Sequence, residues 1–495
     1  MLISDSGVFW DVERLGLAGA VETADGKTVS YRDLIDWADR IVADCPARSL
    51  VAIRCTFTPA ALAAYLGCLR RGLVPLLLDR DMPDDQVAEI LQRYQIAFLW
   101  DDSNPNSVTH GVTHGVTHDV THGVTHDVTH GGDFSRVADV SPTLHPDLAV
   151  LVCTSGSSGR PRCVRLSYAN ITSNAAAIAS YLNLTPADRP LLTLPWSSAF
   201  GLSVIHSHWA VGATVLLPAG SIVERSFWDQ FRTRAATSLA GVPFTFAQLK
   251  RLRLERLNLP SLRLLLQAGG RLSPELVQYF ADLGQELGYR FFVMYGQTEA
   301  TARMAYLQPE LAAFKPTSIG RPIPGGTLTV RDSNGRPQTE PGQVGELFYR
   351  GPNVMLGYAD SAADLALGSV NDGEIGTGDL GYCDADGDFY VAGRLTRFVK
   401  LEGKRIHLDA LEQTLHDWGY EALAVGDDSQ VTVAVRPLRE AAEPMDQLKS
   451  RLASHFRVTH QWFILQRLLE IPYLSNGKVD YWSFAARHAR AAHAQ

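Results

Sequence analysis

Short apolar runs alternate along this chain with amphipathic helical stretches, and this alternation limits the folds it can adopt. Leu148–Cys153, Leu264–Leu266 and Phe291–Met294 are three such runs. A continuous apolar run of this length is typical of a strand buried on both faces. Between the last two runs lies a helix signal, with Ser273 as N-cap and Pro274 at the first helical position. Strand, helix and strand in this order predict parallel pairing and an α/β fold.

The size and charge of the chain narrow its class. With 495 residues, 46% of them hydrophobic, it can bury a large core and form more than one domain. Its formal net charge is −8 and it has no long Lys/Arg run, so we expect no nucleic-acid partner. No apolar run reaches the ~18 residues of a membrane span, and no secretory signal is visible. We therefore expect a cytoplasmic protein.

A histidine-rich repeat interrupts the pattern. Residues 108–130 repeat Val-Thr-His six times and hold six of the 15 histidines. Val and Thr disfavour helix and the interspersed glycines weaken strand, so we expect a mobile surface loop over residues 106–132. The alternative is a metal-binding tract, because neutral imidazoles attract Zn, Ni or Cu. A catalytic metal is not expected there, since the repeat implies no fixed ligand geometry.

The chain changes character near residue 394. The short segment Gly393–Lys400 is basic, and the residues C-terminal to it have their own helical pattern around Leu411 and a strand pattern at Val431–Val435. This predicts a small α+β domain over residues 395–495, joined through a hinge to a large domain over residues 1–394.

A Ser/Gly-rich loop directly follows the first buried run. Its glycines permit tight turns, and successive N–H groups and hydroxyls can cradle a polyphosphate. It is not a Walker loop, because the Gly-Lys-Ser/Thr ending is absent. Taken alone, such a loop is more often a plain linker. Its candidate phosphate-binding residues are Thr154, Ser155, Gly156, Ser157, Ser158, Gly159 and Arg162.

A second polar loop follows the run that ends at Met294. It reads Tyr295, Gly296, Gln297, Thr298 and Glu299. Its tyrosine can stack on a base, and its last two residues offer oxygen ligands that suit Mg²⁺ beside phosphates. The alternative is an ordinary strand-to-helix loop with capping groups.

Two further motifs lie near the C-terminal part. Asp379, followed after a strand-like stretch by Arg394, can hold the two hydroxyls of a ribose, although a turn aspartate and a surface arginine are the plainer interpretation. Near the end, Asn476-Gly477 is a strong turn signal just before Lys478. A lysine at a turn is usually only solvated.

The order and spacing of these motifs resemble the adenylate-forming superfamily, which includes acyl-CoA synthetases, aryl-CoA ligases, adenylation domains of peptide synthetases and luciferases. The chain looks like a stand-alone acyl ligase of this group. The resemblance implies a large multi-layer N-terminal domain, with two packed α/β sheets and a small β-barrel subdomain, and a small mobile α+β C-terminal domain. Further matching segments are Val29–Leu34, Leu66–Asp79, Gln267–Arg271, Ser318–Pro322 and Gly345–Gly351.

By this resemblance, a carboxylate attacks the α-phosphate of ATP, pyrophosphate leaves and an acyl-adenylate forms with the help of Mg²⁺. The Ser/Gly-rich loop would hold the β- and γ-phosphates. Thr298 would contact the α-phosphate, Glu299 would bind the metal, and Asp379 with Arg394 would hold the ribose. The residues implied around the adenine are Gly269, Gly270, Arg271 and Tyr295, with Gly296 and Gln297 beside them.

The resemblance also implies two positions of the small domain. In one, Lys478 would contact the carboxylate and the α-phosphate, where two anions must meet. In the other, Gly403, Lys404 and Arg405 would face a thiol that attacks the acyl-adenylate.

Three positions depart from the family pattern. Arg162 and Cys163 stand where Lys-Gly is usual, which keeps the charge but is not a neutral exchange. Thr396 occupies the hinge position that is commonly Asp or Lys, and we expect the swing to survive there.

The substrate-side residues bear on which acid is activated. Ser198 stands where many acyl-CoA synthetases carry a His or another aromatic gate. Ala199 stands where domains for α-amino acids carry an Asp, and a buried ammonium without a counter-ion is costly. Amino acids are therefore disfavoured, while fatty, short-chain, hydroxy and aryl acids remain open. The expected pocket comprises Trp196, Ser198, Ala199, Phe200, Val242, Met294 and Ala300.

The thiol acceptor stays open between CoA and the phosphopantetheine arm of a carrier protein. A third possibility is an adenylate-binding protein without thioester activity.

Overall fold

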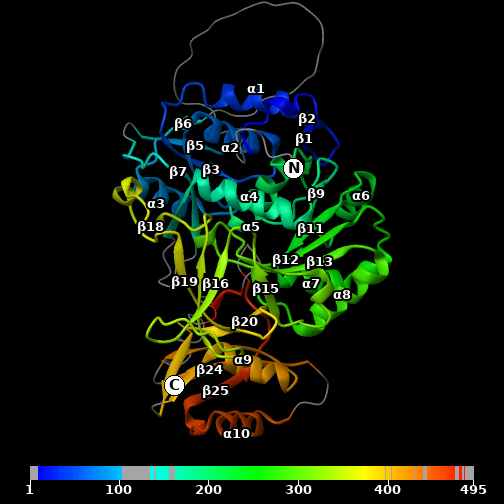
Figure 1. Ribbon diagram of the computed structural model, residues 1–495, viewed down its shortest axis with the longest axis vertical. Coiled ribbons are helices and arrows are strands. Elements are labelled where there is room, and N and C mark those ends of the chain that lie inside the picture. The colour runs from blue at the N-terminus through cyan, green and yellow to red at the C-terminus, as the bar shows by residue number, and fades with distance from the viewer. Residues whose placement is uncertain are drawn as a thin grey trace, which may run out of the picture.

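A large body and a small C-terminal lobe make up the chain in the computed structural model (Figure 1). The sequence repeat, over residues 106–132, lies outside the described residues, so its predicted mobility and the metal-tract alternative stay untested. The structure describes residues 9–102, 134–138, 141–154, 162–395, 397–402, 404–427, 430–438, 443–473, 479–481 and 484.

The first sheet of the body has seven strands among the described residues, in the order β18-β8-β7-β4-β3-β5-β6. Its centre, β7-β4-β3-β5, is parallel, and the outer ladders are antiparallel. The bounds are Leu50–Arg54 (β3), Val74–Leu78 (β4), Phe98–Trp100 (β5), Ser135–Arg136 (β6), Leu148–Thr154 (β7), Arg162–Ser167 (β8) and Gly357–Ala359 (β18).

The second sheet has 13 strands among the described residues, in the order β16-β17-β19-β20-β15-β14-β13-β12-β11-β9-β10-β1-β2. Its strands β13-β12-β11-β9-β10-β1 are parallel, and the rest pair antiparallel. The bounds are Gly19–Glu22 (β1), Thr28–Ser30 (β2), Pro190–Leu191 (β9), Val215–Leu216 (β10), Ser238–Gly241 (β11), Leu264–Gln267 (β12), Arg290–Tyr295 (β13), Ala305–Leu307 (β14), Ser318–Pro322 (β15), Thr327–Arg331 (β16), Gly345–Arg350 (β17), Glu374–Cys383 (β19) and Phe389–Arg394 (β20).

The three apolar runs of the sequence are strands, as predicted. They correspond to β7, β12 and β13, and β12 and β13 pair in parallel on either side of the predicted helix, α8. The side chain of Ser273 caps this helix by accepting a hydrogen bond from the backbone N–H of Leu276, and Pro274 is its first residue. The five strands β16-β17-β19-β20-β15, where the small barrel was expected, form an antiparallel unit continuous with the large sheet.

Helices fill three layers around the two sheets. Alternate side chains of β3 point to opposite faces of the first sheet and so enter two different cores. Val51 and Ile53 pack in the core shared with α4 and α5, and Leu50 and Ala52 pack in the core beneath α3. Helices α6 to α8 cover the far face of the large sheet. The bounds are Tyr31–Ile41 (α1), Pro59–Arg71 (α2), Asp84–Tyr94 (α3), Tyr168–Leu182 (α4), Ala199–Trp209 (α5), Arg225–Thr233 (α6), Pro243–Arg251 (α7) and Pro274–Leu287 (α8).

The C-terminal lobe has a hydrophobic core of its own, as a separate folding unit would. It contains the predicted helix around Leu411 and the predicted strand at Val431–Val435, so the α+β expectation for this region is confirmed. The division at residue 394 stays a prediction. The bounds are Phe398–Leu401 (β21), Lys404–His407 (β22), Leu408–Asp417 (α9), Tyr420–Asp427 (β23), Gln430–Pro437 (β24), Met445–Phe456 (α10) and Phe463–Arg467 (β25).

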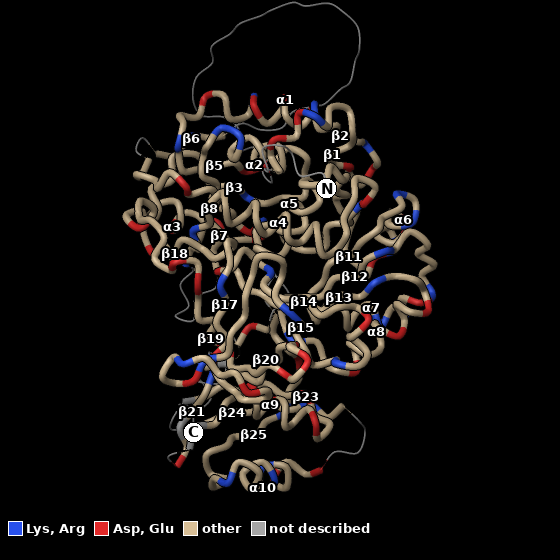
Figure 2. Tube along the Cα trace, in the orientation of Figure 1, with Lys and Arg blue, Asp and Glu red and all other residues tan. Residues whose placement is uncertain are grey.

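Charged residues are distributed over both parts of the molecule. Basic and acidic positions are interspersed along the trace in Figure 2. Of the helices that the structure describes, none combines the length and apolarity that crossing a bilayer requires.

Candidate active site

The predicted nucleotide-side loops lie at the carboxyl ends of β12 and β13. These strands are parallel neighbours, and Gln267 stands directly opposite Val293 in the ladder, so the loops that leave them start side by side. In open α/β sheets, ligands bind at this edge. The structure therefore brings together two segments that lie apart in the sequence, Gly269–Arg271 and Tyr295–Glu299.

The loop after β12 has a fixed shape. The side-chain amide of the buried Gln267 donates a hydrogen bond to the carbonyl of Gly270 at 2.8 Å. Gly269 has φ +80°, and a Cβ there would lie 3.0 Å from Cγ1 of Val242, which is one of the predicted pocket residues. Glycine at this position therefore satisfies both the left-handed backbone and the close approach.

Tyr295 contacts Asp379, the residue predicted to bind the ribose. Its hydroxyl donates to Oδ2 of Asp379 at 2.6 Å, and Asp379 is buried on β19. Asp379 stands directly opposite Arg394 in the β19–β20 ladder, as a shared ribose site would require. The side chain of Arg394 lies outside the described part of the chain. Next to Tyr295, a Cβ on Gly296 would lie 1.9 Å from the carbonyl oxygen of Ala302, so only glycine fits there.

Glu299 belongs to a second cluster, built across the β8–β18 ladder. Oε1 of Glu299 accepts a hydrogen bond from the hydroxyl of Tyr358 at 2.7 Å. Burial, and then the Glu299 carboxylate, raise the pKa of the Tyr358 phenol, so it remains a donor at neutral pH. The Arg162 guanidinium lies 4.1 Å from the centre of the Tyr358 ring and forms a two-pronged ion pair with Asp360, at 2.9 and 3.1 Å.

The ends of the predicted phosphate loop are held close together. Thr154 and Arg162 face each other across the β7–β8 ladder, and residues 155–161 between them lie outside the described chain. Cys163, the residue that departs from the usual glycine, lies within β8 with its side chain in the core beneath α3. Its side chain is therefore part of the packing of the first sheet.

Four of the predicted substrate-side residues lie at or just before the start of α5: Trp196, Ser198, Ala199 and Phe200. The Trp196 ring is fully buried, and its indole N–H donates to the carbonyl of Thr56 at 2.8 Å. Ser198 caps α5: its hydroxyl accepts from the N–H of Gly201 and donates to the carbonyl of Pro195. Its oxygen is thus engaged in capping. Of the other predicted pocket residues, Ala199, Val242 and Met294 are buried in the same core as Trp196, and Phe200 is half-buried against it. Ala300 is buried in a separate core, packed with residues of β16 and β17.

Arg303 is a buried residue at this site that sequence reasoning did not single out. It is 0% exposed, and its guanidinium lies 5.2 Å from the Phe200 ring centre and 3.5 Å from Sδ of Met294. The available signal was a charged residue within the small apolar stretch that follows Glu299. A lone arginine in such a stretch does not reveal its burial without the fold.

The predicted mobile residues are only partly visible. Lys478, Gly403 and the side chains of Lys404 and Arg405 lie outside the described part of the chain. The neighbours of Lys478 are seen: Tyr473 and Val479 form an antiparallel bridge. The Tyr473 ring lies 5.0 Å from that of Phe244 on α7, so this part of the lobe rests against the body.

Comparison with known proteins decides the family. The AMP-binding enzyme family matches residues 10–359, a range that contains Tyr295 and Glu299. The chain belongs to the AMP-binding enzyme family. The oxalate–CoA ligase of Arabidopsis thaliana is 30% identical over 70% of this chain and 70% of its own length. The 2-succinylbenzoate–CoA ligase of Bacillus licheniformis is 32% identical over 65% of this chain and 67% of its own.

A solved structure confirms the fold class of this AMP-binding enzyme. The o-succinylbenzoate coenzyme A synthetase of Bacillus subtilis, in complex with ATP and magnesium ion, matches with a TM-score of 0.74 at 22% identity, covering 96% of this chain and 99% of that one. Together, the family and these relatives establish an ATP-dependent acid–thiol ligase, which makes an acyl-adenylate and passes the acyl group to a thiol.

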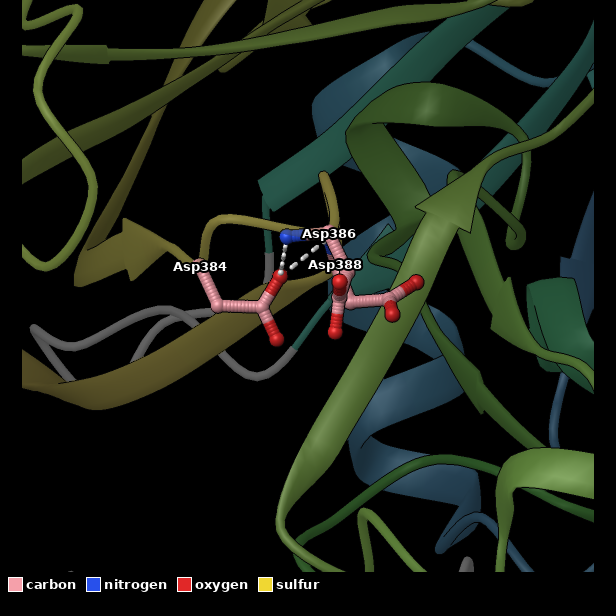
Figure 3. A group of neighbouring side chains, drawn as sticks. All are labelled: Asp384, Asp386 and Asp388. Carbon is pink, nitrogen blue, oxygen red and sulfur yellow. Dashed lines mark hydrogen bonds between the residues drawn. The ribbon is translucent and has the colours of Figure 1, made fainter.

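This AMP-binding enzyme also carries a cluster of three carboxylates at the turn between β19 and β20 (Figure 3). The ammonium of Lys315 lies within 2.6 to 2.8 Å of Asp384, Asp386 and Asp388, and Arg321 pairs with Asp388. The lysine thus occupies the position that a cation would take. The cluster is best explained as a clamp between β15 and the β19–β20 hairpin, which carries Asp379.

Replacing Lys315 with methionine is expected to lower the thermal midpoint by a few degrees at pH 7. Burial opposes ionisation of Asp384, but the ammonium and the backbone N–H of Asp388 outweigh it and lower the pKa of Asp384 to about 2. Because the pKa of Asp384 is lower in the folded chain than its ordinary value of 3.8, ionised Asp384 stabilises the fold at pH values above 3.8. This stabilisation is lost as the pH falls towards 2. The deficit of the variant should therefore shrink between pH 4 and pH 2 in melting curves, while Lys315→Arg should behave like the wild type. A deficit that is independent of pH would contradict the clamp.

Proposed function

We propose that this AMP-binding enzyme joins a small carboxylic acid to coenzyme A through an acyl-adenylate made at the carboxyl ends of β12 and β13. The observation that carries the proposal is a pair of half-buried contacts made by the loop after β13, from Tyr295 to Asp379 and from Tyr358 to Glu299. Each holds a carboxylate in one orientation by a short hydrogen bond from a tyrosine, which is the preorganisation that a nucleotide site needs.

The first contact supports a nucleoside-binding role. An ionised Asp379 accepts hydrogen bonds from the two hydroxyls of a ribose, and the Tyr295 hydroxyl fixes its rotamer. The Tyr295 ring and the rigid Gly269–Arg271 loop then flank the adenine. Arg394, opposite Asp379 in the ladder, would complete the ribose contacts.

The second contact supports a phosphate and metal role. Carboxylate and hydroxyl oxygens, here Glu299 and Thr298, are the ligands that Mg²⁺ prefers, so the donor set fits that ion. When bound, Mg²⁺ would neutralise phosphate charge as pyrophosphate leaves. Tyr358 orients Glu299, and the guanidinium of Arg162 at the end of the phosphate loop adds positive charge. The Asp360 carboxylate holds that guanidinium in place.

Lys478 is proposed to bring the last positive charge. The acid and the α-phosphate are both anions, so a lysine between them reduces the repulsion in the transition state. Lys478 directly precedes Val479, which pairs with Tyr473. The Tyr473 ring lies against Phe244 of the body, and this contact supports delivery of the Lys478 segment to the body. For the second step, the lobe would turn about the hinge at Thr396 and present the segment around Gly403 to the thiol.

CoA is the acceptor we favour, because the relatives from Arabidopsis thaliana and Bacillus licheniformis are both named as CoA ligases. Both are also named for acids with two acidic groups, oxalate and 2-succinylbenzoate. Mass spectrometry after incubation with ATP, Mg²⁺, an acid panel and either CoA or a phosphopantetheinylated carrier protein tests the acceptor. We expect acyl-CoA. Thioester on the carrier alone would contradict CoA as the acceptor, and pyrophosphate release without any thioester would favour the adenylate-binding alternative.

A further inference from the structure

The backbone around Arg303 ties it to the proposed reaction site. Arg303 lies in the connection between β13 and β14, and the next residue, Met304, donates its N–H to the carbonyl of Tyr295 at 2.8 Å. Side-chain amides of Asn174 and Asn353 donate to the carbonyl of Arg303 at 2.9 and 3.2 Å. This residue is therefore held at a fixed place beside the Tyr295–Glu299 segment.

The guanidinium of Arg303 is buried with unused donors. One terminal nitrogen, Nη1, donates to the hydroxyl of Tyr181 at 3.2 Å and lies 3.5 Å from Sδ of Met294. Nε and Nη2 have no hydrogen-bond partner among the described residues. Among the residues that the structure describes, no carboxylate forms an ion pair with Arg303. Burial of a charge with two unused donors is costly, so a complementary group is called for.

A second buried arginine shows what a satisfied site looks like. Arg165 is 1% exposed, and its guanidinium donates to the backbone carbonyls of Tyr358, Leu367, Leu356 and Gly368. Its donors are met by the chain itself, as expected of a structural arginine. The contrast indicates that the described part of the chain does not supply the complement of Arg303.

The surroundings of Arg303 favour an anion over a neutral group. The Nδ1–H of the nearby His208 donates to the carbonyl of Val204 at 2.7 Å, and burial lowers the pKa of His208 to about 4, so the imidazole is neutral. It therefore adds no second positive charge beside the guanidinium. Phe200 and Met294, two predicted pocket residues, contact the guanidinium, which places it on the side where the acyl group would lie.

We propose that Arg303 binds a second acidic group of the substrate, so that this enzyme activates acids carrying a carboxylate remote from the one that becomes the acyl group. Nε and Nη2 are the donors that remain for it, and a carboxylate matches two N–H groups of one guanidinium. A neutral hydroxyl would use the donors but leave the charge unbalanced. This inference rests on the proposed function, because it assigns the substrate of the same site.

The test compares matched acids in ATP–pyrophosphate exchange. Each monocarboxylic acid is paired with the dicarboxylic acid in which its terminal methyl is replaced by a carboxylate: butyrate with succinate, pentanoate with glutarate, and 4-methylbenzoate with terephthalate. We expect kcat/KM for the best dicarboxylic acid to exceed that of its partner by about 100-fold, as for an acid that finds its charge partner. Preference for the monocarboxylic acid in every pair would overturn the inference.

Variants separate recognition from packing. Arg303→Met should reduce the diacid-to-monoacid ratio to about one while KM for ATP changes less than about twofold, and Arg303→Lys should retain part of the preference. Arg165→Met is the matched control: it should lower the thermal midpoint but leave the ratio unchanged. An unchanged ratio in Arg303→Met contradicts the proposal.

Two further outcomes keep the inference distinct from the proposed function. If Arg303→Met does not fold, the wild type alone decides, because the thermal midpoint should rise more with a dicarboxylic acid and ATP than with its monocarboxylic partner. A larger rise with the monocarboxylic acid would overturn the inference. Exchange with monocarboxylic acids only would overturn the role of Arg303 and leave the ligase function standing, whereas no exchange with any acid would count against the proposed function itself.

Discussion

Lys478→Ala is expected to reduce acyl-adenylate formation by about 10³-fold while leaving thioester formation from supplied acyl-AMP nearly unchanged. Removal of one preorganised group that stabilises developing charge typically costs 10²- to 10³-fold in rate. Here two anions must approach, so the larger loss is expected. The second step needs the lobe in its other position, where Lys478 would have left the reaction centre. Pyrophosphate exchange measures the first step, and thioester formation from synthetic acyl-AMP measures the second.

The control for this prediction is Lys449→Ala, a lysine on α10 of the same lobe. We expect both half-reactions of this variant to remain within about twofold of the wild type. An equal loss of both steps in Lys478→Ala would contradict the two-position account, because a lysine that leaves after the first step cannot serve the second.

Glu299→Gln is expected to lower acyl-adenylate formation by about 100-fold and to raise the Mg²⁺ concentration needed for half-maximal rate. The amide keeps the size of the side chain and can still accept the hydrogen bond from Tyr358 through its oxygen, but it loses the charge that attracts the metal. Titration of Mg²⁺ at saturating ATP separates metal affinity from the rate with metal bound.

Tyr358→Phe is the matched variant for this second prediction. It removes the hydroxyl that donates to Oε1 of Glu299 and leaves the carboxylate in place. We expect a loss of several-fold only, since the hydrogen bond orients the carboxylate without supplying charge. A Tyr358→Phe loss equal to that of Glu299→Gln, or a Glu299→Gln rate within twofold of the wild type, would be evidence against a metal role for Glu299.

Local sequence patterns were enough to predict the centre of the large sheet. The apolar runs that became β12 and β13 carry their own burial signal, and Ser273 with Pro274 marks the start of the helix between them. The helix around Leu411 and the strand at Val431–Val435 were predictable for the same reason. Each of these signals lies within one short stretch of chain.

The contacts that build the site do not lie within one stretch. Tyr295 and Asp379 are 84 positions apart, and Arg162 and Asp360 are 198 apart. They meet only because β19 joins the extended sheet and β18 pairs with β8. Hydrophobic periodicity does not predict such pairings. The resemblance named Tyr295, Asp379 and Arg162 one by one, but Asp360 and the contacts between these residues needed coordinates.

Arg303 illustrates the same limit in a stronger form. Its side chain is completely buried, yet its type predicts exposure, because arginine is rarely fully buried without a partner. Its burial results from the packing of the β13–β14 connection against α4, whose Tyr181 and Asn174 it contacts. Only the fold could reveal that no carboxylate of the described chain pairs with this guanidinium.

We expect an acid and ATP to react at the site of Tyr295, Glu299 and Asp379 before any thiol takes part. The decisive experiment is exchange of radioactive pyrophosphate into ATP, measured with the full-length enzyme, Mg²⁺ and an acid panel in the absence of CoA. We predict that label enters ATP only when a cognate acid is present, and that Asp379→Ala abolishes this exchange. Exchange that appears only after CoA is added would contradict the claim.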